Sequence, residues 1–356
     1  MAAAAIVIAM ENNKKVVIGM SGGVDSSVAA SLLQKEGYTV FGVTLDLFET
    51  ENGESQAIQD ARKVCERLGI HHEILDCRKE FQKQVIDYFI GEYAEGRTPN
   101  PCVMCNPNVK FKALFEYADL HKCEFVATGH YIHIWEENGR FCLKQADSQK
   151  DQSYFLYRLE QEQLKRLLMP LWKYEKDKVR SIAESIGLNV AKKPDSQEIC
   201  FIPGNDYISF LKDRTKKGFE PGNFIDLNGN ILGRHQGIAN YTVGQRKGLG
   251  VTFGKPMFVV KINPLDNTVI LGEGNEVFSD TLFAEKLHFI PFEKLKEPME
   301  AEAKIRFGAK TAKCRVEPAG EDRIKVVFEQ PQRAVTAGQS VVFYQKNELI
   351  GGGIIL

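Results

Sequence analysis

Two cysteines separated by two residues are the first feature of the chain that could do chemistry. The stretch TPNPCVMCN, residues 98–106, places Cys102 and Cys105 in a C-x-x-C spacing behind two prolines. Thiolates act both as nucleophiles and as metal ligands. The pair therefore fits half of a zinc site, a thiol–disulfide couple, two ligands of an iron–sulfur cluster, or a catalytic cysteine beside an incidental one.

The other six cysteines narrow these choices. They lie at positions 65, 77, 123, 142, 200 and 314, a scatter that is not typical of a secreted disulfide framework and indicates a reducing cytoplasm. The chain has no second C-x-x-C pair and no H-x-x-x-H pair, so we expect no zinc site. Cys200 lies in the apolar run ICFI, which fits a buried structural cysteine as well as a reactive one. The remaining five fit small buried packing residues.

A glycine- and serine-rich stretch, GMSGGVDSS at residues 19–27, is the second chemical feature. Gly22 and Gly23 allow the backbone to turn tightly and to approach an anion closely. Serine hydroxyls and the first amides of a following helix can then bind phosphate, assisted by the helix dipole. Asp25 among these donors is expected to hold Mg²⁺ or a hydroxyl group. The stretch matches neither a Walker A loop nor the G-x-G-x-x-G dinucleotide fingerprint.

Alternating strands and helices must position these residues. Apolar runs predict strands at 14–20, 38–45, 71–76 and 125–131, and helical periodicity predicts helices at 26–36, 57–68, 81–93 and 110–121. This alternation predicts an α/β fold with a doubly wound, mostly parallel sheet. Such sheets bind ligands beyond the carboxyl ends of their strands. We therefore expect the chemistry on the loops at 20–26, 45–56, 98–106 and 129–131.

The composition changes after Cys200. A glycine-rich region with a hairpin signal at Asn228–Gly229 is followed by alternating runs such as 301–307, 323–328 and 339–345. These runs predict the antiparallel strands of a small C-terminal β-barrel. Residues 205–256 hold eight Lys/Arg against four Asp/Glu, which favours contacts with nucleic-acid phosphates. The basic residues are Lys212, Arg214, Lys216, Lys217, Arg234, Arg246, Lys247 and Lys255.

A chain of 356 residues exceeds one typical core, and we predict three domains. They are a phosphate-binding catalytic domain at 14–204, a central basic module at 205–272 and a β-barrel at 273–356. No run approaches the roughly 18 apolar residues of a membrane helix, so we expect no membrane association.

The stretch SGGVDS resembles the pyrophosphate loop, or PP-loop, of N-type ATP pyrophosphatases. These enzymes have an adenine nucleotide alpha-hydrolase-like fold, activate a carbonyl oxygen as an adenylate and release pyrophosphate. Five further motifs follow in order: GRTPNPCVMCN with VKFK, ATGHY, KDQSYFLY, DSQEICFIP and GRHQGIANYTVGQRKGLG. Together they resemble the tRNA-specific 2-thiouridylases (the MnmA family), which replace the C2 oxygen of the wobble uridine, position 34, with sulfur. The resemblance extends from about Lys14 to the C-terminus and is weakest in the barrel.

The resemblance implies roles for individual residues. The ATP phosphates would bind Gly19, Met20, Ser21, Gly22, Gly23, Val24, Asp25 and Ser26, and the adenosine pocket would include Leu45 and Gly129. The flipped target base would lie at Asn100, Pro101 and Cys102. Other tRNA contacts would come from Lys150, Asp151, Gln152, Arg306 and Phe307. Cys105 and Cys200 match the two catalytic cysteines, of which the second carries a persulfide.

The chemistry of the reaction supports two cysteines in these roles. The C2 carbonyl of uracil is a poor electrophile, so an adenylate must first make its oxygen a leaving group. A persulfide sulfur then attacks, and a second thiol releases the product as a disulfide forms. The attacking sulfur must be anionic, which favours electropositive surroundings. Candidates close by in the sequence are Arg97, Lys110, Lys112 and Lys193.

The resemblance also implies cofactors and partners. Mg²⁺ accompanies ATP, sulfur comes from a cysteine desulfurase or a sulfur-relay protein, and the substrates are tRNAs for Lys, Glu and Gln. One residue departs from the pattern, because the best-described members have Asp where this chain has Cys102. A related branch of tRNA thiolases holds a [4Fe–4S] cluster with a C-x-x-C pair and one distant cysteine, a set that Cys102, Cys105 and Cys200 would offer.

Two mechanisms and two other functions therefore remain open. Sulfur transfer would use either a persulfide and a disulfide or a cluster-bound sulfide. In place of a thiouridylase, the chain would be another PP-loop ligase acting on a small molecule, or a non-catalytic tRNA-binding protein.

Overall fold

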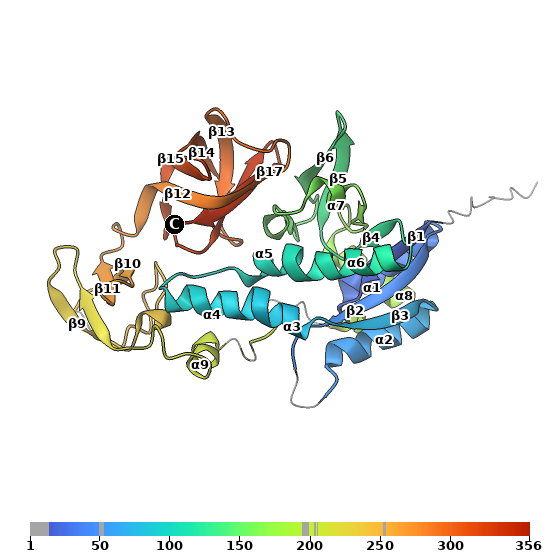
Figure 1. Ribbon diagram of the computed structural model, residues 1–356, viewed down its shortest axis with the longest axis horizontal. Helices are drawn as coiled ribbons and strands as arrows, with labels where there is room; N and C mark the ends of the chain where they lie inside the picture. The colour runs from blue at the N-terminus through green and yellow to red at the C-terminus, as the bar shows by residue number, and fades with distance from the viewer. Residues whose placement is uncertain (1–13, 50–52, 194–198, 203, 205, 252–253) are drawn as a thin grey trace, which may run out of the picture. The chain divides into compact units, whose positions relative to one another are not determined.

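The computed structural model describes residues 14–49, 53–193, 199–202, 204, 206–251 and 254–356 (Figure 1). The predicted loop at 45–56 and the motif at 195–203 lie partly outside the described residues. The chain forms two compact units that do not follow sequence order. Unit 1 comprises residues 1–81, 107–153 and 159–195, and unit 2 comprises 82–106, 154–158 and 196–356.

Unit 1 contains a five-stranded parallel sheet in the order β3-β2-β1-β4-β7. The strands are β1 (Lys15–Gly19), β2 (Thr39–Asp46), β3 (His71–Asp76), β4 (Phe125–Ala127) and β7 (Leu167–Leu168). From β1 the chain winds to one edge through β2 and β3 and then returns to place β4 on the other side of β1. The predicted doubly wound α/β sheet is confirmed, and the β1–β4 boundary is its switch point.

Helices cover both faces of this sheet because alternate residues of β1 point to opposite sides. Val16 and Ile18 are fully buried in one core with α1 (Val24–Lys35), α2 (Gln56–Leu68) and α8 (Lys176–Ser185). The opposite side faces α6 (Lys112–Leu120), whose Leu114 would lie 3.1 Å from a Cβ built on Gly19. Unit 1 also contains an antiparallel hairpin of β5 (Ile132–Glu137) and β6 (Arg140–Gln145).

Two local predictions need correction. The predicted strand at 125–131 ends at Ala127, so the ATGHY motif lies mainly in the loop that follows β4. The predicted loop at 98–106 contains a short helix, α5 (Pro101–Cys105). Asn100 caps this helix by accepting the N–H of Cys102 at 3.1 Å, and Pro101 takes the first helical position, where its missing N–H costs nothing.

The other predicted helices are longer or less regular than expected. A helical stretch runs from α3 (Arg78–Phe81) through a π-helical turn, η1 (Gln82–Ile86), into α4 (Asp87–Ala94). A second π-helical turn, η2 (Asn106–Phe111), joins α5 to α6. π-Helical turns frequently occur at functional sites, and this one begins directly after Cys105.

The central part of unit 2 is a small sheet in the order β10-β11-β8-β9. Its strands are β8 (Gly222–Ile225), β9 (Ile231–His235), β10 (Phe258–Asn263) and β11 (Thr268–Gly272). The predicted hairpin at Asn228–Gly229 is confirmed between β8 and β9, with Gly229 at φ +87°. The carboxylate of Asp226 accepts the backbone N–H groups of Asn228 and Asn230 at 2.9 and 2.8 Å and closes the turn.

The C-terminal part of unit 2 is a closed antiparallel barrel, as predicted. Its strands are β12 (Phe278–Phe289), β13 (Met299–Lys304), β14 (Ala312–Pro318), β15 (Arg323–Arg333), β16 (Ser340–Gln345) and β17 (Glu348–Ile355). They pair in the order β12-β15-β14-β13-β16-β17, and β12 also pairs with β17. Closure removes exposed strand edges, and alternate residues such as Val316, Val326 and Val341 fill the interior. Within the described residues, no helix has the length and apolar character to cross a membrane.

Candidate functional site

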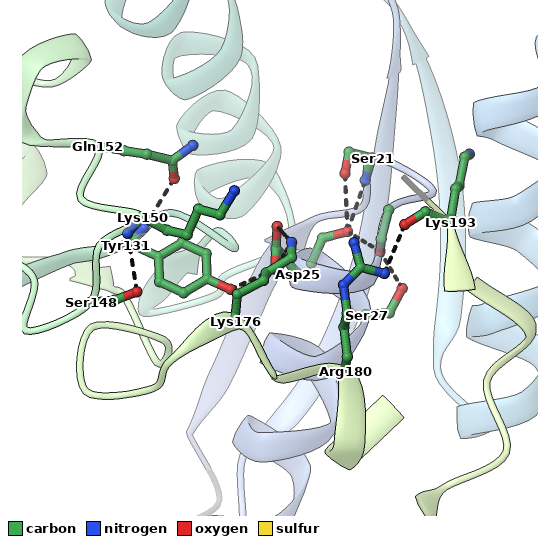
Figure 2. Close-up of polar contacts among 12 residues, drawn as sticks. Ser21, Asp25, Ser27, Tyr131, Ser148, Lys150, Gln152, Lys176, Arg180 and Lys193 are labelled. Carbon is green, nitrogen blue, oxygen red and sulfur yellow. Dashed lines mark hydrogen bonds and ion pairs between the residues drawn. The ribbon is translucent and has the colours of Figure 1, made fainter. Parts of the chain in front are cut away.

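The loop after β1 is held together by its own serines (Figure 2). The hydroxyl of Ser26 accepts the backbone N–H of Ser21 at 3.2 Å, and the two hydroxyl oxygens also lie 3.2 Å apart. Ser26 and Ser27 donate to the carbonyl of Gly23 at 3.3 and 2.7 Å. These bonds fold the loop back onto the first turn of α1, where helix amides and hydroxyls can meet an anion.

Two glycines allow the neighbouring elements to press against this loop. Gly22 has φ +67°, and a Cβ there would lie 2.2 Å from the carbonyl oxygen of Ala57 at the start of α2. A Cβ on Gly129 would lie 2.6 Å from the backbone nitrogen of Ser26 and 2.7 Å from the carbonyl carbon of Asp25. The loops at 20–26 and 129–131, predicted separately from the sequence, therefore meet at the switch point of the sheet.

The other residues predicted to bind ATP have mixed environments. Met20 and Val24 are 2% and 4% exposed and belong to the core, so only their backbones can take part in binding. The Met20 N–H is already used, because it donates to Val43 of β2 at 2.7 Å. Leu45 lies near the carboxyl end of β2, half-buried and beside Leu75 of β3.

Asp25 is the most constrained charged group of the loop. Its Oδ1 accepts the Tyr131 hydroxyl at 2.6 Å and the Lys176 ammonium at 2.8 Å, and its Oδ2 accepts Lys176 at 2.7 Å. The Lys176 side chain is 12% exposed and that of Asp25 33%. The Tyr131 hydroxyl is thus one partner of Asp25 within unit 1. Sequence reasoning missed Tyr131 as this partner, although it ends the ATGHY motif, and missed Lys176, which no motif marked.

A second lysine lies on the α2 side of the loop. Lys193 Nζ donates to the carbonyl of Gly22 at 3.2 Å and to Asp60 Oδ2 at 2.9 Å. Burial opposes ionisation of Asp60, but hydrogen bonds from Lys193 and Gln56 outweigh it and lower the pKa of this carboxyl group. Arg180 of α8 donates to the carbonyl of Lys193 at 2.9 Å and steadies the segment (Figure 2).

Three of the four bases expected to surround the cysteines have carboxylate partners. Lys193 pairs with Asp60, Arg97 forms a two-bond ion pair with Glu92 at 2.7 Å, and Lys112 lies 3.5 Å from Glu80. In the basic module, Lys217 pairs with Glu95, and the guanidinium of Arg214 lies 3.8 Å from the ring centroid of Phe210. Part of the positive charge predicted from the sequence is therefore neutralised within the chain.

The segment predicted to contact tRNA at 150–152 is bound to the loop after β4. The N–H of Tyr131 donates to Gln152 Oε1 at 3.1 Å, and the N–H of Gln152 donates to the Tyr131 carbonyl at 3.0 Å. The Asp151 carboxylate accepts the Ser153 hydroxyl at 2.7 Å, which closes a tight turn. Lys150 is exposed.

The two cysteines predicted to react, Cys105 and Cys200, and Cys102, predicted to contact the target base, belong to unit 2 and differ in exposure. Cys102 is half-buried in the first turn of α5, Cys105 at its end is 4% exposed, and Cys200 is exposed. The interpretation of Cys200 as a buried packing residue is therefore wrong, because Phe201 and Ile202 supply the buried side chains of the ICFI run. Among the residues that the structure describes, no three His, Cys, Asp or Glu side chains gather into a metal site.

The sequence predicts that the other five cysteines are buried, and three of them are. Cys65, Cys123 and Cys314 are buried, whereas Cys77 and Cys142 are half-buried. Burial raises the pKa of the Cys65 and Cys314 thiols to about 12, and that of Cys77 to about 11. These three are protonated packing groups near neutral pH.

Within unit 2, an aromatic pair lies next to α5, the helix that carries Cys102 and Cys105. Phe307 is 45% exposed, and its ring centroid lies 4.4 Å from that of Phe155. The Phe155 carbonyl accepts the amide of Asn106 at 3.1 Å, and Asn106 directly follows Cys105. Arg306, predicted with Phe307 to contact tRNA, donates to the Arg333 carbonyl at 3.1 Å.

Comparison with known proteins shows the family of the chain. Three family profiles match it: the tRNA methyl transferase HUP domain over residues 14–204, the tRNA methyl transferase PRC-barrel domain over 208–273 and the aminomethyltransferase beta-barrel domain over 279–355. The tRNA-specific 2-thiouridylase MnmA of Clostridioides difficile is 51% identical over 354 residues, which cover 96% of this chain and 98% of that protein. The chain belongs to the tRNA-specific 2-thiouridylases.

Other members of this family match equally well. The 2-thiouridylase MnmA 2 of Clostridium botulinum strain Langeland is 52% identical over 96% of this chain and 98% of its own length. That of Clostridium acetobutylicum is 51% identical over 96% and 99%. The 2-thiouridylases therefore match this chain from the PP-loop domain to the barrel.

The Gly129 contact gives a first test. Gly129→Ala would bring a methyl group within 2.6 Å of backbone atoms of α1, so the loop must move, and we expect ATP binding to weaken by about tenfold or more. Isothermal titration calorimetry with ATP measures this. The control is Gly91→Ala, within α4, where a Cβ meets nothing within 4 Å and alanine is the better helix former. Normal ATP affinity in Gly129→Ala would contradict the placement of the nucleotide at this loop.

His130 gives a pH-dependent test. Its ring bonds Thr128 at 2.7 Å, and burial, followed by the charge of Lys110, lowers the pKa of His130 to about 3. The unfolded chain protonates near pH 6.5, so this group's contribution to stability is lost as pH falls below that value, by at most about 1.4 kcal/mol per pH unit. Urea unfolding at pH 7 and pH 5 should show wild type losing more stability than His130→Gln. An equal loss in both proteins would show that the imidazole is not held neutral.

Proposed function

We propose that this chain catalyses the ATP-dependent 2-thiolation of uridine 34 in tRNA. Identity of 51–52% to 2-thiouridylases over nearly the whole chain carries the proposal. An ATP-using activity of unit 1 is supported by the PP-loop, whose serines are hydrogen-bonded to one another, and by the contact between Asp25 and Lys176. We also propose domains at 14–204, 205–272 and 273–356 and a cytoplasmic location.

The first step activates the base. The C2 oxygen of uridine 34 attacks the α-phosphorus of ATP, the bond to the β-phosphate oxygen breaks, and pyrophosphate leaves. Residues 19–26 bind the phosphates, Leu45 and Gly129 border the adenosine, and Asp25 would hold the Mg²⁺ that offsets phosphate charge. Lys176, whose ammonium lies 2.7 Å from the Asp25 carboxylate, supplies positive charge for the departing pyrophosphate.

The second step transfers sulfur. A persulfide on Cys200 attacks C2 of the adenylated base through its terminal sulfur, and AMP leaves. The Cys105 thiolate then attacks the Cys200 sulfur, which forms a Cys105–Cys200 disulfide and releases 2-thiouridine. A thiol reductant restores both thiols. The exposure of Cys200 suits a group that another protein loads with sulfur, and the burial of Cys105 suits a thiol protected until the base arrives.

The tRNA is held by several parts of the chain. Uridine 34 is unpaired in the anticodon loop, so flipping it towards Asn100, Pro101 and Cys102 costs little. Further contacts come from Lys150, Asp151, Gln152, Arg306 and Phe307, with the exposed Phe307 ring suited to base stacking. The substrates are tRNAs for Lys, Glu and Gln, and a cysteine desulfurase or a relay protein supplies the sulfur.

The reaction itself is the first test of this proposal. Purified protein with Mg-ATP, unmodified tRNA and a persulfide donor should form 2-thiouridine and pyrophosphate, measured by mass spectrometry of digested tRNA and by a pyrophosphate assay. Cys105→Ala and Cys200→Ala should form no 2-thiouridine, because each removes one of the two sulfurs. Cys314→Ala, at a buried barrel position, is the control and should retain activity. Pyrophosphate exchange that depends on a small carboxylic acid and not on tRNA would instead indicate a small-molecule ligase.

Iron content and a Cys102 variant distinguish the persulfide mechanism from the cluster mechanism. Protein purified without oxygen should contain less than one iron per chain, and Cys102→Asp should keep most of its thiolation activity, because a persulfide route needs only Cys105 and Cys200. Iron and sulfide analysis together with the thiolation assay checks both points. About four irons per chain in wild type, lost together with activity in Cys102→Asp, would establish the [4Fe–4S] route instead.

A further inference from the structure

The PP-loop and the segment 150–152 are joined in unit 1 through one residue, Tyr131. Its hydroxyl donates to Asp25 Oδ1 at 2.6 Å, while its backbone N–H and carbonyl bond Gln152 at 3.1 and 3.0 Å (Figure 2). Tyr131 is 2% exposed, so its ring cannot swing freely between these ends. A displacement of Gln152 therefore acts on the backbone that carries the hydroxyl.

The two donors on Asp25 have different effects. Lys176 Nζ lies 2.8 Å from Oδ1 and 2.7 Å from Oδ2, so it compensates the charge but scarcely distinguishes the two oxygens. Tyr131 bonds Oδ1 alone and at a shorter distance. The Tyr131 hydroxyl therefore fixes the rotation of the Asp25 carboxylate, on which the binding of an ion or phosphate would depend. Lys176 compensates the negative charge of the carboxylate.

The far end of this connection is Gln152, which lies in the segment proposed to contact tRNA. The Gln152 amide oxygen points at Tyr131, and the amide nitrogen points away from it (Figure 2). The neighbouring turn is fixed by Asp151, whose carboxylate accepts the Ala146 N–H at 3.1 Å and the Ser153 hydroxyl at 2.7 Å. Gln152 thus presents a donor outwards from a rigid turn and an acceptor inwards to Tyr131.

We propose that Tyr131 is a positioning residue that couples tRNA bound at Gln152 to the orientation of Asp25, so that adenylation is fast only for a uridine on tRNA held at Gln152. The inference rests on the proposed function, because it needs both ligands. tRNA held by Gln152 stabilises the arrangement seen here, with the Tyr131 hydroxyl on Oδ1. Without tRNA the Gln152–Tyr131 bonds open more readily, and Asp25 is less often in the orientation that supports pyrophosphate release.

Tyr131→Phe tests the connection while keeping the buried ring. Pyrophosphate release is measured at saturating Mg-ATP with and without an unmodified tRNA transcript. We expect the kcat for tRNA-dependent pyrophosphate release to fall about tenfold, the scale of one hydrogen bond to a charged group, with the KM for tRNA changing less than kcat. The control is Tyr157→Phe, which also removes a fully buried hydroxyl, 3.2 Å from Ser340, in unit 2. Equal behaviour of the two variants would overturn the proposal and leave the Tyr131 hydroxyl a structural group only.

Gln152 provides a second pair of variants that does not disturb the buried ring. Gln152→Glu keeps an oxygen that can accept the Tyr131 N–H, whereas Gln152→Met removes it. At saturating tRNA, the Met variant should lose the stimulation, whereas the Glu variant, which loses the amide donor but keeps the acceptor for Tyr131, should show a raised KM for tRNA and a smaller fall in kcat. Combined with Tyr131→Phe, the Met change should add little further loss, because both act on one connection. Losses that multiply in the double variant would overturn the coupling.

The proposed function and the proposed coupling predict different results for the wild-type protein. If the wild-type protein shows no tRNA-dependent pyrophosphate release, the proposed function fails and the coupling fails with it. If wild type responds to tRNA and Tyr131→Phe responds equally well, only the coupling is wrong.

Discussion

The backbone of Gly129 lies directly against the first turn of α1, and the geometry of the PP-loop depends on this contact. Strand order reverses between β1 and β4, so the ends of these strands open side by side, and a residue with a Cβ at 129 would occupy the space of the Ser26 amide. Gly22 permits an equally close approach of Ala57 from the α2 side. Held from both sides, the loop can direct its serines and helix amides to one place without relying on long side chains.

The parts of this site that follow from local sequence could be predicted. The strands of unit 1 are short buried runs, and the glycines and serines of residues 19–27 are typical of an anion-binding turn, so the α/β fold and the loop were both accessible. Lys176 was not, because it lies 151 residues from Asp25 and begins a helix with no chemical motif. Only the packing of α8 beside α1, which the chain order does not reveal, brings its ammonium to the carboxylate.

Helix α5, which carries Cys102 and Cys105, could not be predicted for a different reason. A Pro-Asn-Pro stretch is typical of a loop, yet Asn100 and Pro101 together begin α5, because a capping side chain and a fixed φ suit the first turn of a helix. Five residues give no periodicity from which such a helix can be predicted. Cys200 was ambiguous for a related reason: its apolar neighbours predict burial of the run but do not show which residues of the run point inwards. Phe201 and Ile202 do, and the sulfur is left exposed.

In the proposed mechanism, the different exposure of Cys200 and Cys105 suits these two sulfurs to different steps. An exposed thiol can reach a donor protein but is also open to oxidation, whereas a buried one is protected but cannot be loaded from outside. Cys200 and Cys105 have these opposite properties. Asn106 next to Cys105 adds a restraint, because its amide bonds the Phe155 carbonyl beneath the exposed Phe307 ring. In the proposed complex, a base stacked on Phe307 would touch the aromatic pair whose Phe155 carbonyl holds Asn106, the residue next to Cys105.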